Sequence, residues 1–102
     1  MSKMMTIGLH RGSKRIWIEG KQLSSVGFTP FALFDVHLFE NKKGVQLVLS
    51  DDGKYRVSGR NKNNPDKPTI PVIDLKCEVI SEAFEAGQKV SMSLKQGSIY
   101  IK

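Results

Sequence analysis

The sequence has little of what covalent or metal-based stabilisation requires. Of its 102 residues, one is a cysteine, Cys77, and two are histidines. A single cysteine excludes an intrachain disulfide, and two histidines leave too few soft ligands for a tetrahedral zinc cage. No apolar run approaches membrane-spanning length, and charged residues interrupt the N-terminal segment, unlike a secretory leader. We therefore expect a soluble, unprocessed cytoplasmic protein without a membrane partner, a metal or a cofactor.

The sequence patterns of common catalytic sites are also missing. There is no G-x-G-x-x-G run, and both Gly-Lys pairs lack the upstream Gly and following Ser or Thr of a phosphate-binding loop. No serine lies in a G-x-S-x-G elbow. His10 lies in a basic run without an evident carboxylate partner, and His37 lies on the outer face of a predicted strand. We expect no catalytic residues.

Charge is what the chain has in excess. Sixteen Lys and Arg against ten Asp and Glu give a net charge of +6, which favours polyanionic partners. The excess is confined to residues 1–27, with a net charge of +4, and residues 51–70, with +2; the rest of the chain is neutral. With 39% hydrophobic residues, the chain can form one small core, so we expect a single domain over 1–102.

Residues 15–30, RIWIEGKQLSSVGFTP, predict a compact series of elements. Isoleucines alternate with polar or aromatic residues as in a half-buried strand, and a short helical turn follows at 22–26. Gly27 suits a left-handed helix end of the Schellman type, in which Phe28 contacts the last helical turn, and Pro30 prevents the helix from resuming. Two alternating strands, 34–38 and 45–49, then predict a β-hairpin.

The C-terminal third repeats this order. A strand at 72–73 precedes a helix at 79–84, an Ala-Gly turn and a hairpin of strands 90–94 and 99–101. Ile18 and Ile73 are 55 residues apart, and the two phenylalanines after the helices are 56 apart. We predict repeat one at about 15–50, a basic strand and loop linker at 51–70, and repeat two at about 71–102.

Two such units have a reason to pair, since neither a lone hairpin nor one helical turn can bury its apolar face. Pairing within the chain would produce a mainly β fold with short helices, closed as a barrel. A basic segment precedes each copy, and alternating residues predict one strand at 5–9 and another at 55–57. The alternative is that two unrelated hairpins only look alike.

The pattern W-I-x-G-K-x-L-x-x-x-G-F-x-P, which ends at Pro30, resembles the core motif of SymE-type toxins in the AbrB/SpoVT swapped-hairpin barrel superfamily. VISEAFEAGQKVSMSLKQGSIYI is similar to the more general AbrB half-barrel. HRG, RIWIEGK, VSGR and PVIDL more loosely resemble domains attached to phage cytosine DNA methyltransferases. At Phe31 the family usually has Gly after Pro, so we expect a type I or altered turn there.

The resemblance implies a swapped-hairpin barrel that binds DNA through basic residues on one side. Family members usually build the barrel from two chains; here both halves lie in one chain, which implies a monomeric pseudo-dimer or a homodimer. If a pseudo-twofold axis relates the basic segments 10–15 and 56–62, they converge into a phosphate-binding stripe. The predicted nucleic-acid-binding residues are His10, Arg11, Lys14, Arg15, Trp17, Lys21, Arg56, Arg60 and Lys62.

Two aromatic residues are candidates for stacking on unpaired bases, Trp17 and Tyr55. Trp17 is out of phase with the isoleucines beside it, so it should face away from their side of the strand. Packing of this ring within the protein is the alternative. The basic loops likewise have an alternative interpretation as ordinary solvated surface.

We therefore predict a small basic nucleic-acid-binding protein with a regulatory or accessory role, related to phages or toxin–antitoxin systems, with DNA ahead of RNA as its partner. One alternative is a phage-type protein that binds and inhibits a host nucleic-acid-handling defence complex, in the manner of an anti-CRISPR or anti-restriction protein. A more remote alternative is a SymE-like ribonuclease toxin that uses His10 or His37.

Overall fold

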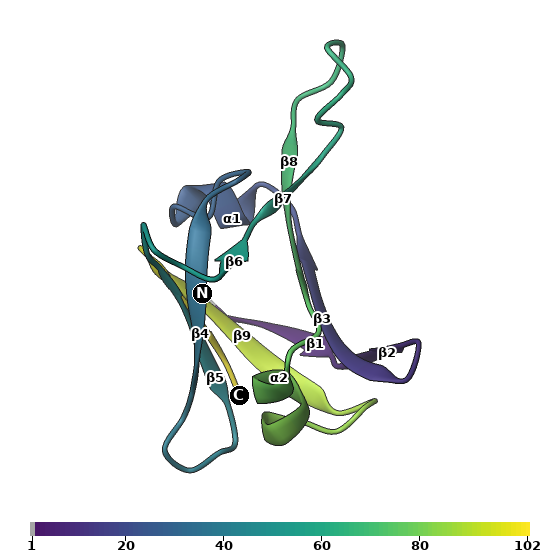
Figure 1. Cartoon of the computed structure of the whole chain (residues 1–102), viewed down its shortest axis with the longest axis vertical. Coiled ribbons are helices and arrows are strands. Elements are labelled where there is room, and N and C mark those ends of the chain that lie inside the picture. The colour runs from purple at the N-terminus through teal and green to yellow at the C-terminus, as the bar shows by residue number, and fades with distance from the viewer. Residues whose placement is uncertain (1) are drawn as a thin grey trace.

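The computed structural model describes residues 2–102, which form strands and two short helices (Figure 1). In chain order the elements are β1 (Ser2–Thr6), β2 (Gly8–His10), β3 (Ser13–Glu19), α1 (Gln22–Ser25), β4 (Leu33–Leu38), β5 (Val45–Leu49), β6 (Tyr55–Arg56), β7 (Ser58–Arg60), β8 (Ile70–Leu75), α2 (Glu78–Ala83), β9 (Lys89–Lys95) and β10 (Ser98–Ile101). Within 2–102, no helix has the length and apolar character needed to cross a membrane.

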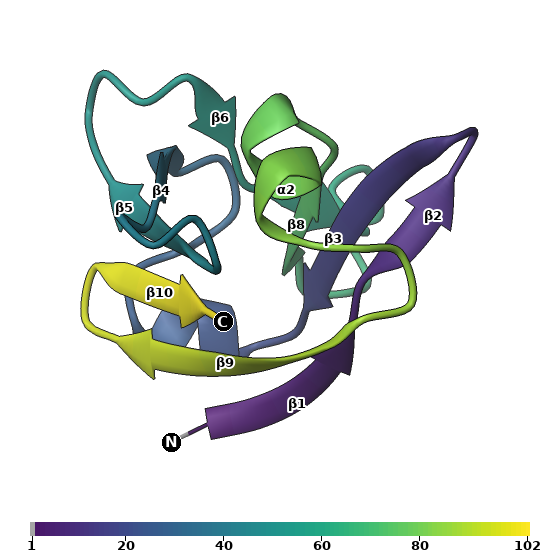
Figure 2. The same ribbon diagram turned by 90° about the horizontal axis from the view of Figure 1, so that it is seen from below.

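The strands form two antiparallel sheets. One has six strands in the order β1-β9-β10-β5-β4-β6, and the other has four in the order β2-β3-β8-β7. The mainly β fold with short helices is therefore confirmed. The closed barrel is not found, because the hydrogen-bonded pairings within residues 2–102 leave two separate sheets, which curve around a shared interior (Figure 2).

The chain passes from one sheet to the other at two bends. Strands β1 and β2 meet at Ile7, whose backbone exchanges hydrogen bonds of 2.8 Å with Gly87 and Gln88. Strands β6 and β7 meet at Val57, which makes the same pair of 2.8 Å bonds with the residues after Pro30. The continuous strand expected at 5–9 is thus wrong: the bend buries Ile7 and leaves Leu9 63% exposed.

The two halves of the chain make matching strand pairs. Gly8 and Ser58 each follow directly after a bend, and they pair with Arg15 in β2–β3 and with Val72 in β7–β8. Arg15 therefore corresponds to Val72, and each residue of β3 has its equivalent 57 positions later. This offset makes Asp74 the equivalent of Trp17, and the two are paired directly across β3 and β8. The sequence alignment of Ile18 with Ile73 is wrong by two residues, an even shift that keeps every side chain on its face.

Local turn chemistry explains how the first half enters its hairpin. Gly27 has φ +96°, and the amide of Phe28 donates to the carbonyl of Leu23 at 2.9 Å, which confirms the Schellman ending. The expected type I or altered turn at Phe31 is wrong. Phe31 has φ +74°, close to the +84° of Gly87 in the second half, so the turn keeps the left-handed geometry without glycine.

The core lies between the two sheets and consists of aliphatic and aromatic side chains from both halves. No polar side chain of the described residues is buried in it. Ile16 and Ile18 face this core from β3, which places the residues between and beside them on the outer surface of the four-stranded sheet. The largest fully buried side chains are Phe28, Phe34, Phe84, Ile7, Ile16, Leu23, Leu47, Ile73, Ile80, Ile99, Ile101 and Val45.

Candidate functional site

The outer face of the four-stranded sheet presents an exposed tryptophan. Because Ile16 and Ile18 point into the core, Arg15, Trp17 and Glu19 point outward from β3. Trp17 is 46% exposed, which confirms its predicted orientation, and it lies where the two halves of the sheet meet, opposite Asp74. About half of a large aromatic ring is thus available to a partner on this face of the sheet.

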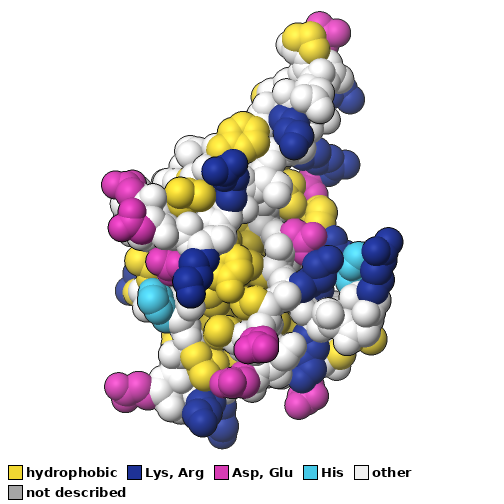
Figure 3. Space-filling model, viewed as in Figure 1, with side chains coloured by type: hydrophobic (Ala, Val, Ile, Leu, Met, Phe, Trp, Pro, Cys, Tyr) yellow, Lys and Arg dark blue, Asp and Glu magenta, His cyan; other side chains and the backbone are white. Residues whose placement is uncertain are grey.

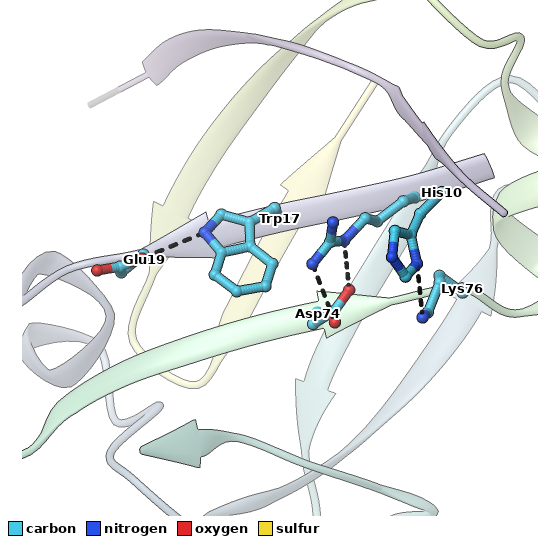
Figure 4. A network of polar contacts seen from close by, with 6 residues as sticks. His10, Trp17, Glu19, Asp74 and Lys76 are labelled. Atoms are coloured by element: carbon cyan, nitrogen blue, oxygen red, sulfur yellow. Dashed lines mark hydrogen bonds and ion pairs between the residues drawn. The ribbon is translucent and has the colours of Figure 1, made fainter. Parts of the chain in front are cut away.

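A continuous line of polar contacts holds the tryptophan ring in place (Figure 4). Asp74 accepts two hydrogen bonds from Arg15, at 2.8 and 3.3 Å, and the guanidinium carbon of Arg15 lies 4.4 Å from the centre of the indole ring. On the other side, the indole Nε1–H donates to Glu19 Oε1 at 3.2 Å, and Glu19 Oε2 accepts from Arg60. We call this series the Trp17 line: Asp74, Arg15, Trp17, Glu19 and Arg60.

The Trp17 line contributes more to orientation than to stability. Its ion pairs are partly exposed, and such pairs are typically worth only about 0–1 kcal/mol. The bidentate geometry of Arg15 on Asp74 nevertheless fixes the guanidinium plane, and the stacked guanidinium fixes one face of the indole. An exposed aromatic ring with few accessible rotamers loses little side-chain entropy when it binds a partner.

Two open hollows flank the tryptophan. The larger, of about 460 Å³, extends across β8 and β7 and is lined by Trp17, Glu19, Ser58, Gly59, Arg60, Val72 and Asp74. The smaller, of about 230 Å³, lies toward β1 and is lined by Lys3, Met5, Trp17, Ile18, Glu19, Gln22 and Met92. Trp17 and Glu19 border both hollows and form a ridge between them. Each hollow has a cationic side chain in its lining, Arg60 in one and Lys3 in the other.

Two more of the predicted residues are held by contacts near the β2–β3 end of the sheet. His10 Nδ1 lies 3.2 Å from Lys76 Nζ, beyond the Arg15–Asp74 pair (Figure 4). Lys14 instead connects β3 to α2, because its Nζ donates to the carbonyl of Ser81 at 3.0 Å and lies 3.5 Å from Glu85.

The predicted convergence of the two basic segments is wrong at their tips. The β2–β3 turn, which carries Arg11, and the β7–β8 loop, which carries Lys62, lie at opposite ends of the sheet because β3 and β8 run antiparallel (Figure 1). The β7–β8 loop projects from the body and is folded by successive turn hydrogen bonds. Of the nine predicted nucleic-acid-binding residues, only Arg15, Trp17 and Arg60 belong to the Trp17 line, because alternation along β3 and β7 places their side chains on the same outer face.

The remaining predicted residues, Lys21 and Arg56, lie outside the four-stranded sheet. Lys21 is exposed at the start of α1, and Arg56 is exposed in β6, at the edge of the six-stranded sheet. Neither of them, nor Arg11 or Lys62, is in an ion pair within residues 2–102.

The positive charge is concentrated on this part of the molecule. The four-stranded sheet and its connections, residues 8–19 and 58–76, contain seven Lys and Arg against three Asp and Glu, a net charge of +4 out of +6. In Figure 3, Lys and Arg side chains gather over the β2–β3 turn and the base of the β7–β8 projection, whereas acidic side chains lie mainly at the left and lower edges.

Tyr55, the second stacking candidate, packs toward the core instead. Its ring lies against Phe34 with a centroid separation of 5.8 Å. Burial raises the pKa of Tyr55 above its usual value, and the neighbouring thiol of Cys77 raises it further. Tyr55 is thus partly covered, and it lies in β6 of the six-stranded sheet, apart from the face that carries Trp17.

Sequence reasoning missed the acidic members of the site. Glu19 could have been found from the alternation Arg-x-Trp-x-Glu, which places the three side chains on one face of a strand. Asp74 could not, because its contact with Arg15 depends on the register of β3 against β8, 59 residues apart in sequence.

The described residues contain no cluster of three or more His, Cys, Asp or Glu side chains that could hold a metal ion. No protein-family model, curated protein or solved structure matches this chain. The site must therefore be interpreted from its own geometry.

Proposed function

We propose that this protein binds nucleic acid, in a regulatory or accessory role, through the outer face of its four-stranded sheet. The observation that carries the proposal is the fixed, exposed Trp17, with Arg15 stacked on it, within the part of the chain that holds four of its six net positive charges. Aromatic rings stack on bases, and Lys and Arg neutralise phosphates. A sheet face with both features matches what a nucleic acid offers a protein.

The pattern of ion pairs indicates which residues contact phosphates and which position Trp17. Arg15 is held by two hydrogen bonds to Asp74 and is mostly covered, so it is a poor phosphate ligand and serves to position Trp17. Arg60 contacts Glu19 through one nitrogen only and keeps 61% of its side chain exposed, so it can also contact a phosphate. Arg11, Lys62 and Lys76 have no carboxylate partner within residues 2–102, and we assign phosphate contacts to them.

We further propose that the fold is a single-chain pseudo-dimer of the swapped-hairpin type. Three features support it: the two halves make equivalent pairings, β1 from the first half pairs with β9 of the second, and β6 from the second half pairs with β4 of the first. Each half thus supplies an edge strand to the hairpin of the other.

A salt-dependent binding assay tests the function. Fluorescence anisotropy with a labelled DNA or RNA oligonucleotide should show binding that weakens steeply between about 50 and 200 mM salt. Replacing Arg11 or Lys62 by Ser should reduce the salt slope by about one unit each. The control is Lys43→Ser, an exposed lysine in the β4–β5 loop of the other sheet, which should leave the slope unchanged. Absence of binding at low salt, or equal effects of all three variants, contradicts the proposal.

One observation favours a second candidate, a protein-binding inhibitor of a nucleic-acid-handling defence complex. The two ion pairs neutralise much of the charge beside Trp17, and a Trp flanked by paired Arg side chains is typical of the centre of protein–protein interfaces. This candidate replaces the first if nucleic acid does not bind while the protein inhibits such a complex and Trp17→Ala abolishes the inhibition.

We do not propose a ribonuclease. That alternative used His10 or His37 with a nearby Lys or Arg, and because the two histidines lie in different sheets, only one of them could serve at such a site. His10 contacts a lysine, and His37 is exposed in β4, where it pairs in register with Gln46.

A further inference from the structure

The geometry around Trp17 restricts the form of nucleic acid that can use it. In a duplex, the faces of the bases are covered by their neighbours in the stack, and a protein contacts base edges and phosphates. A fixed, exposed aromatic ring offers its face, which only an unpaired base can contact. Trp17 is therefore suited to single strands, because its free surface has no complementary partner on intact duplex DNA.

The two hollows define a path for such a strand. The larger hollow, on the Arg60 side, is within the range of about 300–1,000 Å³ usual for small-ligand pockets, so it has room for a base. Its floor includes Ser58, Gly59 and Val72, which are small or apolar. The smaller hollow, on the Lys3 side, continues past the Trp17–Glu19 ridge. A strand that crosses the ridge has a cation available on each side for its backbone.

The carboxylates on either side of the indole, Glu19 and Asp74, oppose a phosphate there but suit a base. Glu19 and Asp74 would repel a phosphate placed over the indole, whereas a carboxylate oxygen can accept a hydrogen bond from an amino group on a base edge. The charge pattern thus directs bases toward Trp17 and the backbone toward Arg60 and Lys3. Arg15, already stacked on the indole, would extend the stack to three layers: guanidinium, indole and base.

We propose that the outer sheet face binds single-stranded nucleic acid, with one unpaired base stacked on Trp17 and the strand crossing the Trp17–Glu19 ridge from the Arg60 hollow to the Lys3 hollow. This inference rests on the proposed nucleic-acid-binding function and specifies the strandedness and the contact residue. It predicts that Trp17 discriminates unpaired from paired bases, and that phosphate-contacting lysines and arginines do not.

Trp17 is the only tryptophan in the chain, so its fluorescence reports on the proposed contact directly. The full-length protein should be titrated with a mixed-sequence single-stranded DNA of about 12 nucleotides, the RNA of the same sequence, and the matching DNA duplex. We expect at least one single strand to quench the fluorescence and to bind more tightly than the duplex. Comparison of the two single strands identifies the preferred sugar.

Variants then separate stacking from general charge. Loss of one base stack corresponds to about a 5- to 150-fold weaker affinity, so Trp17→Ala should lose this factor for the single strand and little for the duplex. Trp17→Phe should retain most of the affinity. The matched control is Phe31→Ala, because Phe31 is similarly exposed, at 51%, but lines neither hollow.

The outcomes distinguish the inference from the function it rests on. Salt-dependent binding of duplex at least as tight as single strand, without quenching, overturns the inference and leaves nucleic-acid binding in place. No binding of any of the three nucleic acids at low salt overturns both. Circular dichroism of Trp17→Ala verifies that the variant is folded. If it is not, the fluorescence quenching of the wild-type protein still tests the inference.

Discussion

The two phenylalanines that follow the helices provide a sharp test of how the halves are joined. Phe28 and Phe84 occupy equivalent positions, and both are almost fully buried, at 0% and 2% exposure. We consider replacing each by Leu, which keeps the site apolar but removes three carbons. Because strands of each half pair with the hairpin of the other, damage to either half should reach the whole molecule.

The structure predicts unequal costs for the two changes. Phe→Leu removes three carbons from a filled core site, a large-to-small change that costs about 1–3 kcal/mol, and this is the expected loss for Phe84→Leu. Phe28 also makes an edge-to-face contact with Phe34, with ring centroids 5.8 Å apart and an interplanar angle of 61°. Such a pair adds about 0.5–1.5 kcal/mol, so Phe28→Leu should cost that much more. Both losses fit within the roughly 5–15 kcal/mol expected for a domain of this size.

Urea unfolding followed by circular dichroism and by Trp17 fluorescence measures both quantities. We expect one transition for each variant, coincident by the two probes, with an unchanged slope and a lower midpoint. Two separate transitions, or a variant that shifts only one probe, would show that the halves fold independently. A Phe28→Leu cost no greater than that of Phe84→Leu would refute the contribution assigned to the aromatic pair.

Three other changes test particular contacts. Gly87 has φ +84° and open space where an added Cβ would lie, so Gly87→Ala should lower the free energy of unfolding by about 1–2 kcal/mol through backbone strain alone; an unchanged urea midpoint contradicts this. Asp74→Asn should cost at most about 1 kcal/mol of stability yet weaken single-strand binding, since it removes the carboxylate that holds Arg15 and, through Arg15, the Trp17 ring; unchanged or tighter binding in the anisotropy assay counts against the positioning role of the Trp17 line. The raised pKa of Tyr55 means that the unfolded state loses this proton first, so the contribution of Tyr55 to the free energy of unfolding should be fully present below pH about 10 and be lost above it; a pH series of urea midpoints in which Tyr55→Phe falls just as steeply would exclude this cause.

Local pattern was sufficient for most elements of the fold. Alternation at 34–38 and 45–49 predicted β4 and β5, and Gly27 predicted the helix ending, because strand period and left-handed glycine geometry are properties of a few neighbouring residues. The same reasoning failed at Phe31, where local preference favours glycine. There the amide of Phe31 donates a hydrogen bond to the carbonyl of Val57, which lies at the bend between β6 and β7, so a distant part of the chain helps to hold the turn.

Long-range register accounts for what sequence reasoning missed in the site. The outward orientation of Trp17 followed from β3 alone. Its fixation by Arg15, Asp74 and Arg60 required β3 to lie against β8, and β8 against β7, in one particular register. The opposite placement of the two basic tips likewise follows from the antiparallel direction of β3 and β8, which no single segment contains.

The amino-acid sequence by itself determined the strand-rich character, the two similar series of elements, the positive charge and the outward face of Trp17, because period, turn preference and charge are local quantities. Only the tertiary structure decided that the arginines of the Trp17 line are paired with carboxylates, that Tyr55 packs against the core, and that the sheets stay separate. Those outcomes depend on which strands hydrogen-bond to which, and pairing energies are shared among residues far apart in the chain.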